Sequence, residues 1–165
     1  MTEEQIDDLV KYIRLAKQDK ILLPNLPLRL FEALNEYVSL PVVEVILVDK
    51  QNRFLLTYRD DEHWHGWHIP GGFVGVRESI QNACSRIAMR ELGIECTFIK
   101  VVNAIAWENN HDFSSPISIF CLCTVKGDKA PQDGTYFDTC PEDTIGFHKA
   151  FFSQHWNDLQ LNHTM

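Results

Sequence analysis

The residues of this chain best suited to chemistry lie in a glycine-rich turn and the helix expected after it, at residues 70–94 (PGGFVGVRESIQNACSRIAMRELGI). Gly71 and Gly72 have no side chain, so the backbone there can approach an ion or a ligand closely. On a helical wheel Glu91 falls on the apolar stripe, where a carboxylate is costly unless a cation or hydrogen bonds compensate it. The position of Glu91 therefore indicates a bound metal ion or a paired arginine, unless this helix end is simply frayed and solvated.

Two arginines lie on a neighbouring face of the same helix. Arg86 and Arg90 are four residues apart, a spacing at which like charges repel. Arg86 precedes Glu91 by five residues, which is not a favourable spacing for a pair within one helix. An anion such as a diphosphate would account for the two arginines, because a guanidinium binds phosphate oxygens in a fork. The alternative is an ordinary solvated helix face.

Residues 70–94 resemble the Nudix box, whose pattern is Gly-x5-Glu-x7-Arg-Glu-U-x-Glu-Glu-x-Gly-U, with U an aliphatic residue. The positions that match in register are Gly72, Glu78, Arg86, Glu91, Gly93 and Ile94. The resemblance implies an α/β fold, the Nudix-type α/β/α sandwich with a mixed β-sheet and a loop-helix-loop catalytic motif. It also implies a hydrolase in which Glu78 and Arg86 are catalytic, while the Gly71 carbonyl and the Glu91 carboxylate hold a metal ion.

Two positions depart from the pattern. Ile87 stands where the family has a glutamate, and Arg90 stands where it has the first of two glutamates. Magnesium prefers hard oxygen ligands, so the loss of two carboxylates argues against a cluster of two or three ions. The resemblance then implies a single Mg²⁺, with Mn²⁺ possible, shared by Gly71, Glu91, the substrate diphosphate and water.

The departures are similar to one branch of the family, the GDP-mannose mannosyl hydrolases, whose box resembles residues 86–93 closely except at Arg90. In that branch Arg90 is replaced by a small neutral residue, so here it either contacts phosphate or fills the space of a lost metal. The resemblance assigns substrate contacts to Glu44 in the first strand and to Arg59 where the hairpin ends. Phe73 stands where the branch has a phosphate-binding arginine.

The general base and the specificity loop lie outside the box. The base of the branch is a histidine in a late loop, and Glu142 aligns with it. A carboxylate can also serve as a base, and His148 and His111 are the other candidates. Trp107 and Asn109 begin a polar loop after a strand, where the resemblance places substrate binding.

These residues predict magnesium-dependent hydrolysis of a GDP-mannose-like nucleoside diphosphate sugar, with water attacking C1 of the sugar. One metal and several arginines suit a leaving diphosphate better than a multi-metal attack on phosphorus. Two alternatives stay open. One is a Nudix pyrophosphatase that splits the diphosphate, and the other is a Nudix module that binds a nucleotide sugar without catalysis.

The elements that must position these residues follow from hydrophobic periodicity. Strands are expected over 42–48, 53–58, 95–106, 116–125 and 144–148, and helices over 4–18, 28–36, 79–92 and 151–159. Residues 60–68 and 126–142 have the composition of loops. The first two helices form an N-terminal extension, residues 1–38, before a Nudix domain at 39–165. The apolar stripe of the N-terminal extension predicts that the extension packs against the domain or forms a homodimer. The alternative is that the extension is a lid over the site.

Bulk properties narrow the function further. The 165 residues carry a formal charge of −8, which disfavours nucleic acids and anionic membranes as partners. No apolar stretch approaches the length of a membrane span, and the N-terminus is acidic and polar, unlike a signal peptide. The five cysteines include no Cys-x-x-Cys pair, so reduced thiols in a cytoplasmic protein are expected. Cys121 and Cys123 alternate along a strand and are expected to face one buried side.

Overall fold

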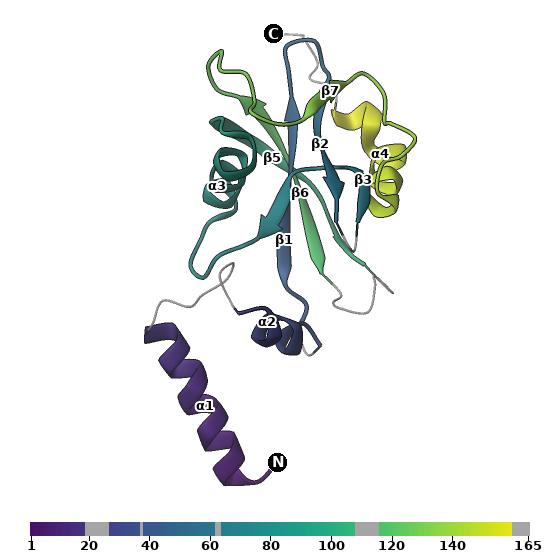
Figure 1. Cartoon of the computed structure of the whole chain (residues 1–165). Coiled ribbons are helices and arrows are strands. Elements are labelled where there is room, and N and C mark those ends of the chain that lie inside the picture. The colour runs from purple at the N-terminus through teal and green to yellow at the C-terminus, as the bar shows by residue number, and fades with distance from the viewer. Residues whose placement is uncertain (19–26, 37, 62–63, 108–115, 160–165) are drawn as a thin grey trace.

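The computed structural model describes residues 1–18, 27–36, 38–61, 64–107 and 116–159 (Figure 1). The elements in chain order are α1 (Glu3–Gln18), α2 (Leu28–Asn35), β1 (Pro41–Val48), β2 (Phe54–Asp60), β3 (His65–His68), β4 (Gly71–Phe73), α3 (Ile80–Leu92), β5 (Cys96–Ala106), β6 (Ile117–Val125), β7 (Thr135–Phe137) and α4 (Gly146–Leu159).

Within the described residues, seven strands form one mixed sheet. Its main path is β3-β2-β1-β6-β5, while β4 pairs with β1 and β7 pairs with β2. The central pair β1 and β6 is parallel, and the other pairs are antiparallel. Helix α3 covers one face and α4 covers the other (Figure 1). The α/β/α sandwich expected from the sequence is therefore confirmed.

Strand β1 is buried from both sides because it lies in the middle of the sheet. Val43, Val45 and Leu47 pack toward α3, while Ile46 and Val48 pack toward α4. A strand covered on both faces reads as a continuous apolar run rather than an alternating one, which is the pattern from which this strand was expected. Its antiparallel pairing with β2 joins the first two expected strands, 42–48 and 53–58, as a hairpin.

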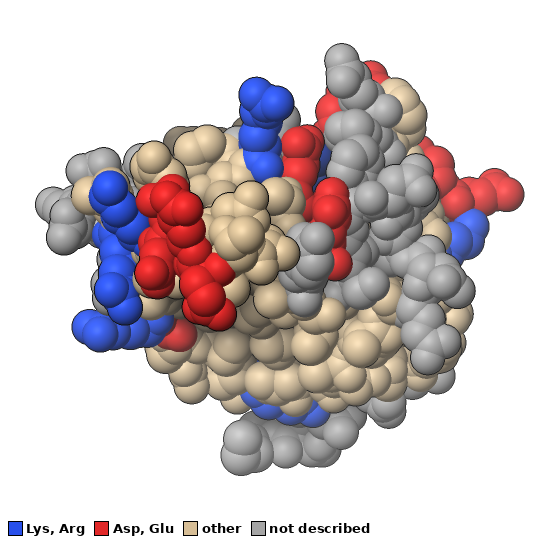
Figure 2. Space-filling view, turned by 90° about the horizontal axis from the view of Figure 1, so that it is seen from below, with Lys and Arg blue, Asp and Glu red and all other residues tan. Residues whose placement is uncertain are grey.

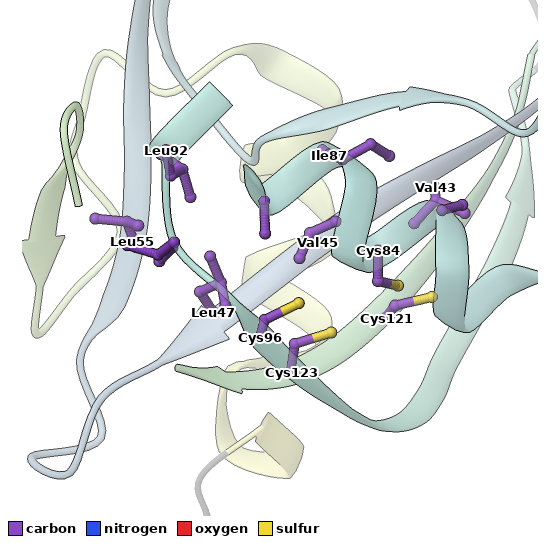
Figure 3. Packing of buried hydrophobic residues seen from close by; sticks show 13 residues of the cluster. Val43, Val45, Leu47, Leu55, Cys84, Ile87, Leu92, Cys96, Cys121 and Cys123 are labelled. Atoms are coloured by element: carbon purple, nitrogen blue, oxygen red, sulfur yellow. The ribbon is translucent and has the colours of Figure 1, made fainter. Parts of the chain in front are cut away.

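The core between α3 and the sheet contains four of the five cysteines (Figure 3). Cys84 comes from α3, Cys96 from β5, and Cys121 and Cys123 from β6, and all are buried as free thiols. The expectation that the two β6 cysteines face one buried side is confirmed. They behave as small apolar residues of the core.

Local signals define both ends of α3. Ser79 precedes the helix, and its side chain accepts a hydrogen bond from the backbone N–H of Asn82 at 3.2 Å. Gly93 follows it with φ of 65°, a left-handed conformation that glycine adopts without a Cβ penalty. The bounds expected from the sequence, 79–92, are therefore confirmed to within one residue.

Three expectations about the strands were wrong. The expected loop at 126–142 contains β7, which pairs with β2. The segment expected as a last strand, 144–148, holds only an isolated bridge between Thr144 and Trp67, and α4 begins at Gly146. Its apolar residues serve a helix instead, since Lys149 N–H already donates to the carbonyl of Ile145. Part of the expected loop at 60–68 forms β3, which pairs with β2. The loop-like composition of this segment does not reveal the strand, because its hydrogen bonds go to β2.

The two N-terminal helices are confirmed and differ in their contacts. The side chains of residues 1–15 are all exposed, including the apolar ones of α1. Helix α2 instead touches the domain, with the rings of Phe31 and Phe73 in an edge contact at 5.0 Å. In Figure 2, which views the molecule from the end where these helices lie in Figure 1, acidic and basic side chains lie side by side. Among the described residues, no helix has both the length and the hydrophobicity that crossing a membrane requires.

Candidate active site

A pocket of about 460 Å³ lies where β2, β3, β4 and the C-terminal end of α3 meet. The described residues that line it are Thr57, Tyr58, Arg59, His68, Gly71, Gly72, Phe73, Arg90, Glu91 and Asp133. Its volume is in the usual range of small-molecule sites, and its lining combines aromatic rings with a few charged groups. Five of these residues were singled out by the sequence analysis. Arg59 and Arg90 were expected at the substrate, Gly71 and Glu91 at the metal ion, and Phe73 was a departure from the branch.

The glycine turn is fixed by close contacts on both sides. Strand β4 pairs Gly71 with Glu44 of β1. A Cβ on Gly71 would lie 2.2 Å from a Glu44 carboxylate oxygen, and a Cβ on Gly72 would lie 3.0 Å from Nη2 of Arg90. The absence of side chains therefore lets a carboxylate approach one side of the turn and a guanidinium approach the other.

Arg90 and Glu91 form the charged part of the pocket. Arg90 Nη2 donates to Glu91 Oε1 at 2.5 Å and to the carbonyl oxygen of Gly71 at 3.3 Å. Burial raises the pKa of the Glu91 carboxyl, and the hydrogen bond from Arg90 acts in the opposite direction. The sequence left open a metal ion, a paired arginine or a solvated helix end for Glu91. The structure shows a paired arginine, and it is the adjacent residue.

Glu78 and Arg86 make a second pair, which fastens the loop before α3 to the helix. Arg86 Nε and Nη2 donate to the two carboxylate oxygens of Glu78, both at 2.7 Å. Arg86 Nη2 also donates to the carbonyl of Phe73, and Gly75 N–H donates to Glu78. The hydrogen bonds from Arg86 hold the pKa of Glu78 below its usual value. These two residues, expected to be catalytic, are not among the described residues that line the pocket.

The sequence analysis assigned Glu44 a substrate contact. In the structure Glu44 lies behind the glycine turn and does not line the pocket. It is buried, and Oε1 accepts a hydrogen bond from the Ser118 hydroxyl at 3.0 Å. Oε2 lies 3.5 Å from Nε2 of His148. Because His148 Nδ1 accepts from the backbone N–H of Ile69, its neutral form carries the proton on Nε2, facing Glu44.

His68 is a pocket residue whose place depends on strand pairing. Its Nδ1 donates to the carbonyl of Ile69 at 2.9 Å, and its Nε2 accepts from the Thr57 hydroxyl at 3.0 Å. Burial lowers the pKa of His68, so the ring is neutral at pH 7. Thr57 and His68 are cross-strand partners in β2 and β3, which explains why they meet at the pocket.

Arg59 is the second guanidinium of the pocket. It lies on β2, its side chain is 46% exposed, and its Nε forms an ion pair with Asp61. Arg90 is also 46% exposed. Two half-exposed arginines beside a glycine turn give the pocket donors for an anion.

Other residues singled out by the sequence lie elsewhere. Glu142 is exposed and does not line the pocket. Trp107 packs against Phe120 and Phe147 at the end of β5, and it is likewise outside the lining. Asn109 and His111 lie outside the described residues.

Four lining residues were given no role in the sequence analysis: Thr57, Tyr58, His68 and Asp133. Thr57 was within reach, because it lies two residues before Arg59 on a strand and therefore shares its face. Asp133 comes from the connection between β6 and β7, and only the tertiary structure brings it to the pocket.

Comparison with known proteins agrees with this geometry. The model of the NUDIX domain matches residues 38–158, so the chain belongs to the Nudix family. No curated protein matches the chain.

Solved structures share the fold at low sequence identity. A MutT protein from Methanosarcina mazei Go1 is 20% identical, with 73% of this chain and 94% of that chain covered and a TM-score of 0.60. An ADP-ribose pyrophosphatase from Streptococcus suis is 16% identical, with 72% and 92% covered and a TM-score of 0.53. A bifunctional NMN adenylyltransferase/ADP ribose pyrophosphatase from Francisella tularensis, complexed with AMP and a Mn ion, is 13% identical, with 79% and 46% covered and a TM-score of 0.61.

Nudix hydrolases generally use divalent metal ions, so the fit of such an ion can be tested on these residues. No group of three or more His, Cys, Asp or Glu is arranged to hold a metal within the described ranges. The two expected ligands, the Gly71 carbonyl and Glu91, both accept hydrogen bonds from Arg90. A cationic side chain bonded to both oxygens repels a second cation there. In this arrangement of Arg90, the two expected ligands do not fit the ion.

Proposed function

We propose that this chain hydrolyses a nucleoside diphosphate sugar to a nucleoside diphosphate and the free sugar, with water attacking C1. The observation that carries the proposal is the pocket that contains both Arg59 and Arg90 beside the Gly71–Gly72 turn. A diphosphate fits this lining because guanidinium groups and a Cβ-free backbone suit phosphate oxygens. The sugar class, GDP-mannose-like, rests on the resemblance of residues 86–93 to the mannosyl hydrolases.

The reaction at carbon asks little of the pocket. As the bond between C1 and the diphosphate oxygen breaks, negative charge grows on the leaving diphosphate, and the two arginines stabilise it. An attack on phosphorus assisted by several metals would need carboxylates. Two positions where the family pattern has them hold Ile87 and Arg90 instead. The arginines of the pocket therefore suit stabilisation of a leaving diphosphate better than they suit activation of a water that attacks phosphorus.

Besides His148 and His111, which the sequence also offered, two residues are candidates for the base that activates water, and His68 is added from the structure. Glu142 is the one that the resemblance assigns, and its exposed carboxylate lies outside the pocket lining. His68 lines the pocket, burial lowers its pKa and favours the neutral ring, and Nε2 can take a proton from water once the Thr57 hydroxyl no longer donates to it. The pH profile of turnover in Glu142→Gln and His68→Gln tests them, because only loss of the true base removes the acidic limb of that profile.

The product assay tests the function itself. A panel of nucleoside diphosphate sugars is incubated in water enriched in heavy oxygen, with and without magnesium, and phosphorus NMR and mass spectrometry locate the label. Label in the free sugar with unlabelled nucleoside diphosphate supports attack at C1. Label in a phosphate product contradicts it and favours the alternative, a pyrophosphatase of the kind named in the similar structures.

Binding of nucleotide sugars without turnover would favour the other alternative, a Nudix module that only binds. The retained pattern at Gly72, Glu78, Arg86 and Glu91 is the reason to place hydrolysis first.

We also propose that residues 1–38 act as a separate extension through which two copies of the chain associate. The apolar side chains of α1, including Ile6, Leu9 and Ile13, are exposed along one amphipathic helix, and a second copy offers a matching stripe. Light scattering after size exclusion tests this, comparing the full chain with the variant Leu9→Asp, Ile13→Asp. A monomeric wild-type chain contradicts it.

A further inference from the structure

We infer that the guanidinium of Arg90 takes the place of a divalent ion in this Nudix site, so that the pocket binds a diphosphate group without metal. The identity of the ligand as a diphosphate rests on the proposed function. The exclusion of the metal does not, because it concerns only the groups around the Gly71–Gly72 turn.

The first observation is the position of the cation. Arg90 Nη2 hydrogen-bonds to the Gly71 carbonyl at 3.3 Å and to the Glu91 carboxylate at 2.5 Å. Magnesium would need oxygen ligands at about 2.0–2.1 Å in an octahedral shell. An ion that used both oxygens would occupy the same space as this nitrogen. Arg90 therefore neutralises the Glu91 carboxylate as an ion would, with no further ligands required.

The second observation is that the surroundings are built for this side chain. A Cβ on Gly72 would lie 3.0 Å from Arg90 Nη2 and 3.5 Å from Cγ1 of Ile87. The turn thus contacts both residues that replace glutamates of the family pattern. Ile87 is fully buried, so it supplies an apolar floor where an oxygen ligand would otherwise stand.

The third observation is that Arg90 has donors left for a ligand. Its side chain is 46% exposed and lines the pocket. Only Nη2 makes hydrogen bonds to residues that the structure describes, so Nε and Nη1 are available. These two donors lie on different edges of the guanidinium, so each can donate separately to a phosphate oxygen. Arg59 lines the same pocket and adds a second guanidinium.

Manganese binding tests the exclusion of the metal. Free Mn²⁺ is measured by electron paramagnetic resonance during titration of the chain, with no nucleotide present. Wild type is expected to show no stoichiometric site, and Arg90→Ala is expected to gain one that binds at least about tenfold tighter than anything in wild type. Adding Glu91→Gln to Arg90→Ala should remove the gained site. The control, Lys100→Ala, removes an exposed charge of β5 outside the pocket and should behave as wild type.

Calorimetry with inorganic pyrophosphate tests the ligand. Wild type should bind pyrophosphate in the presence of EDTA, and Arg90→Ala should bind it at least about tenfold more weakly. Magnesium should leave wild type unchanged and should restore part of the binding to Arg90→Ala. If Arg90→Ala does not fold, Arg90→Gln replaces it, since glutamine keeps the aliphatic part of the side chain out to Cγ and carries no charge.

A stoichiometric manganese site in wild type as tight as that in the variant overturns the inference, and so does pyrophosphate binding that requires magnesium or is absent in EDTA. Failure of the proposed function has a different signature. It gives no free sugar in the product assay, while the manganese and pyrophosphate titrations keep the expected results.

Discussion

The Nudix segment contains two carboxylate–guanidinium pairs that are built differently. In the first, two nitrogens of Arg86 meet both oxygens of Glu78, and the side chains are only 30% and 15% exposed. In the second, one nitrogen of Arg90 meets one oxygen of Glu91, and the side chains are 46% and 23% exposed. A pair with both ends engaged is suited to hold a loop, and a pair with free donors is suited to bind a ligand. The same residue types therefore serve stability in one place and recognition in the other.

The largest expected effect separates the two pairs by stability. Glu78→Ala leaves the guanidinium of Arg86 without its carboxylate, and Arg86 Nη1 is already a buried donor with no partner among the described residues. We expect the free energy of unfolding to fall by about 2 kcal/mol, because this half-buried pair loses two hydrogen bonds between charged groups, each of which is worth more than a neutral one. Urea denaturation at pH 7 measures it. The control is Glu95→Ala, whose pair with Lys126 is more than 60% exposed on both sides and should matter by less than about 0.5 kcal/mol.

A smaller effect of the first pair appears at low pH. The pKa of Glu78 is lowered in the folded chain from the usual 4.5. As the pH falls below about 4.5, the unfolded chain therefore takes up this proton more readily. The stabilisation by Glu78 is complete above that pH and is lost as the pH falls through the lowered folded pKa. Unfolding free energies of wild type and Glu78→Gln, measured from pH 7 to 3, should converge in acid. A constant difference would contradict the role of the ionised pair.

Loss of the Arg90–Glu91 pair should change ligand binding more than stability, the reverse of the Glu78–Arg86 pair. Arg90→Ala removes a half-exposed pair, so the free energy of unfolding should change by less than about 1 kcal/mol. Pyrophosphate affinity should fall at least about tenfold, equivalent to about 1.4 kcal/mol. Denaturation and calorimetry on one preparation give both numbers. A stability loss as large as that of Glu78→Ala, with binding intact, would remove the distinction between the pairs.

The smallest expected effect sharpens the role of Glu91. Glu91→Gln keeps the size of the side chain and an oxygen that can accept from Arg90, but it removes the charge that competes with a phosphate. We expect pyrophosphate to bind a few-fold more tightly in EDTA, measured by calorimetry. If Glu91 instead holds a metal ion, this variant should show unchanged binding in EDTA and should lose any binding that depends on magnesium.

Much of the fold could be predicted because its signals are local. The apolar run of β1, the cap at Ser79 and the left-handed Gly93 lie within the elements that they define. Strands β4 and β7, with three residues each, have no such signal, since their hydrogen bonds go to strands distant in the chain. The start of α4 was mistaken for a strand for the same reason.

The sequence by itself determined the family segment, the order of the main elements and the presence of acidic and basic groups near a glycine turn. Which arginine meets which glutamate was decided only by the tertiary structure. Arg86 finds Glu78 eight residues away because the loop folds back on the helix, and Arg90 reaches the carbonyl of Gly71 because β4 is held against β1. A charge pair depends on distances of a few ångströms between side chains, and spacing along a chain does not fix such distances. The motif left open whether Arg90 contacts phosphate or fills the space of a metal ion, and only the fold shows its guanidinium bonded to both expected ligand atoms.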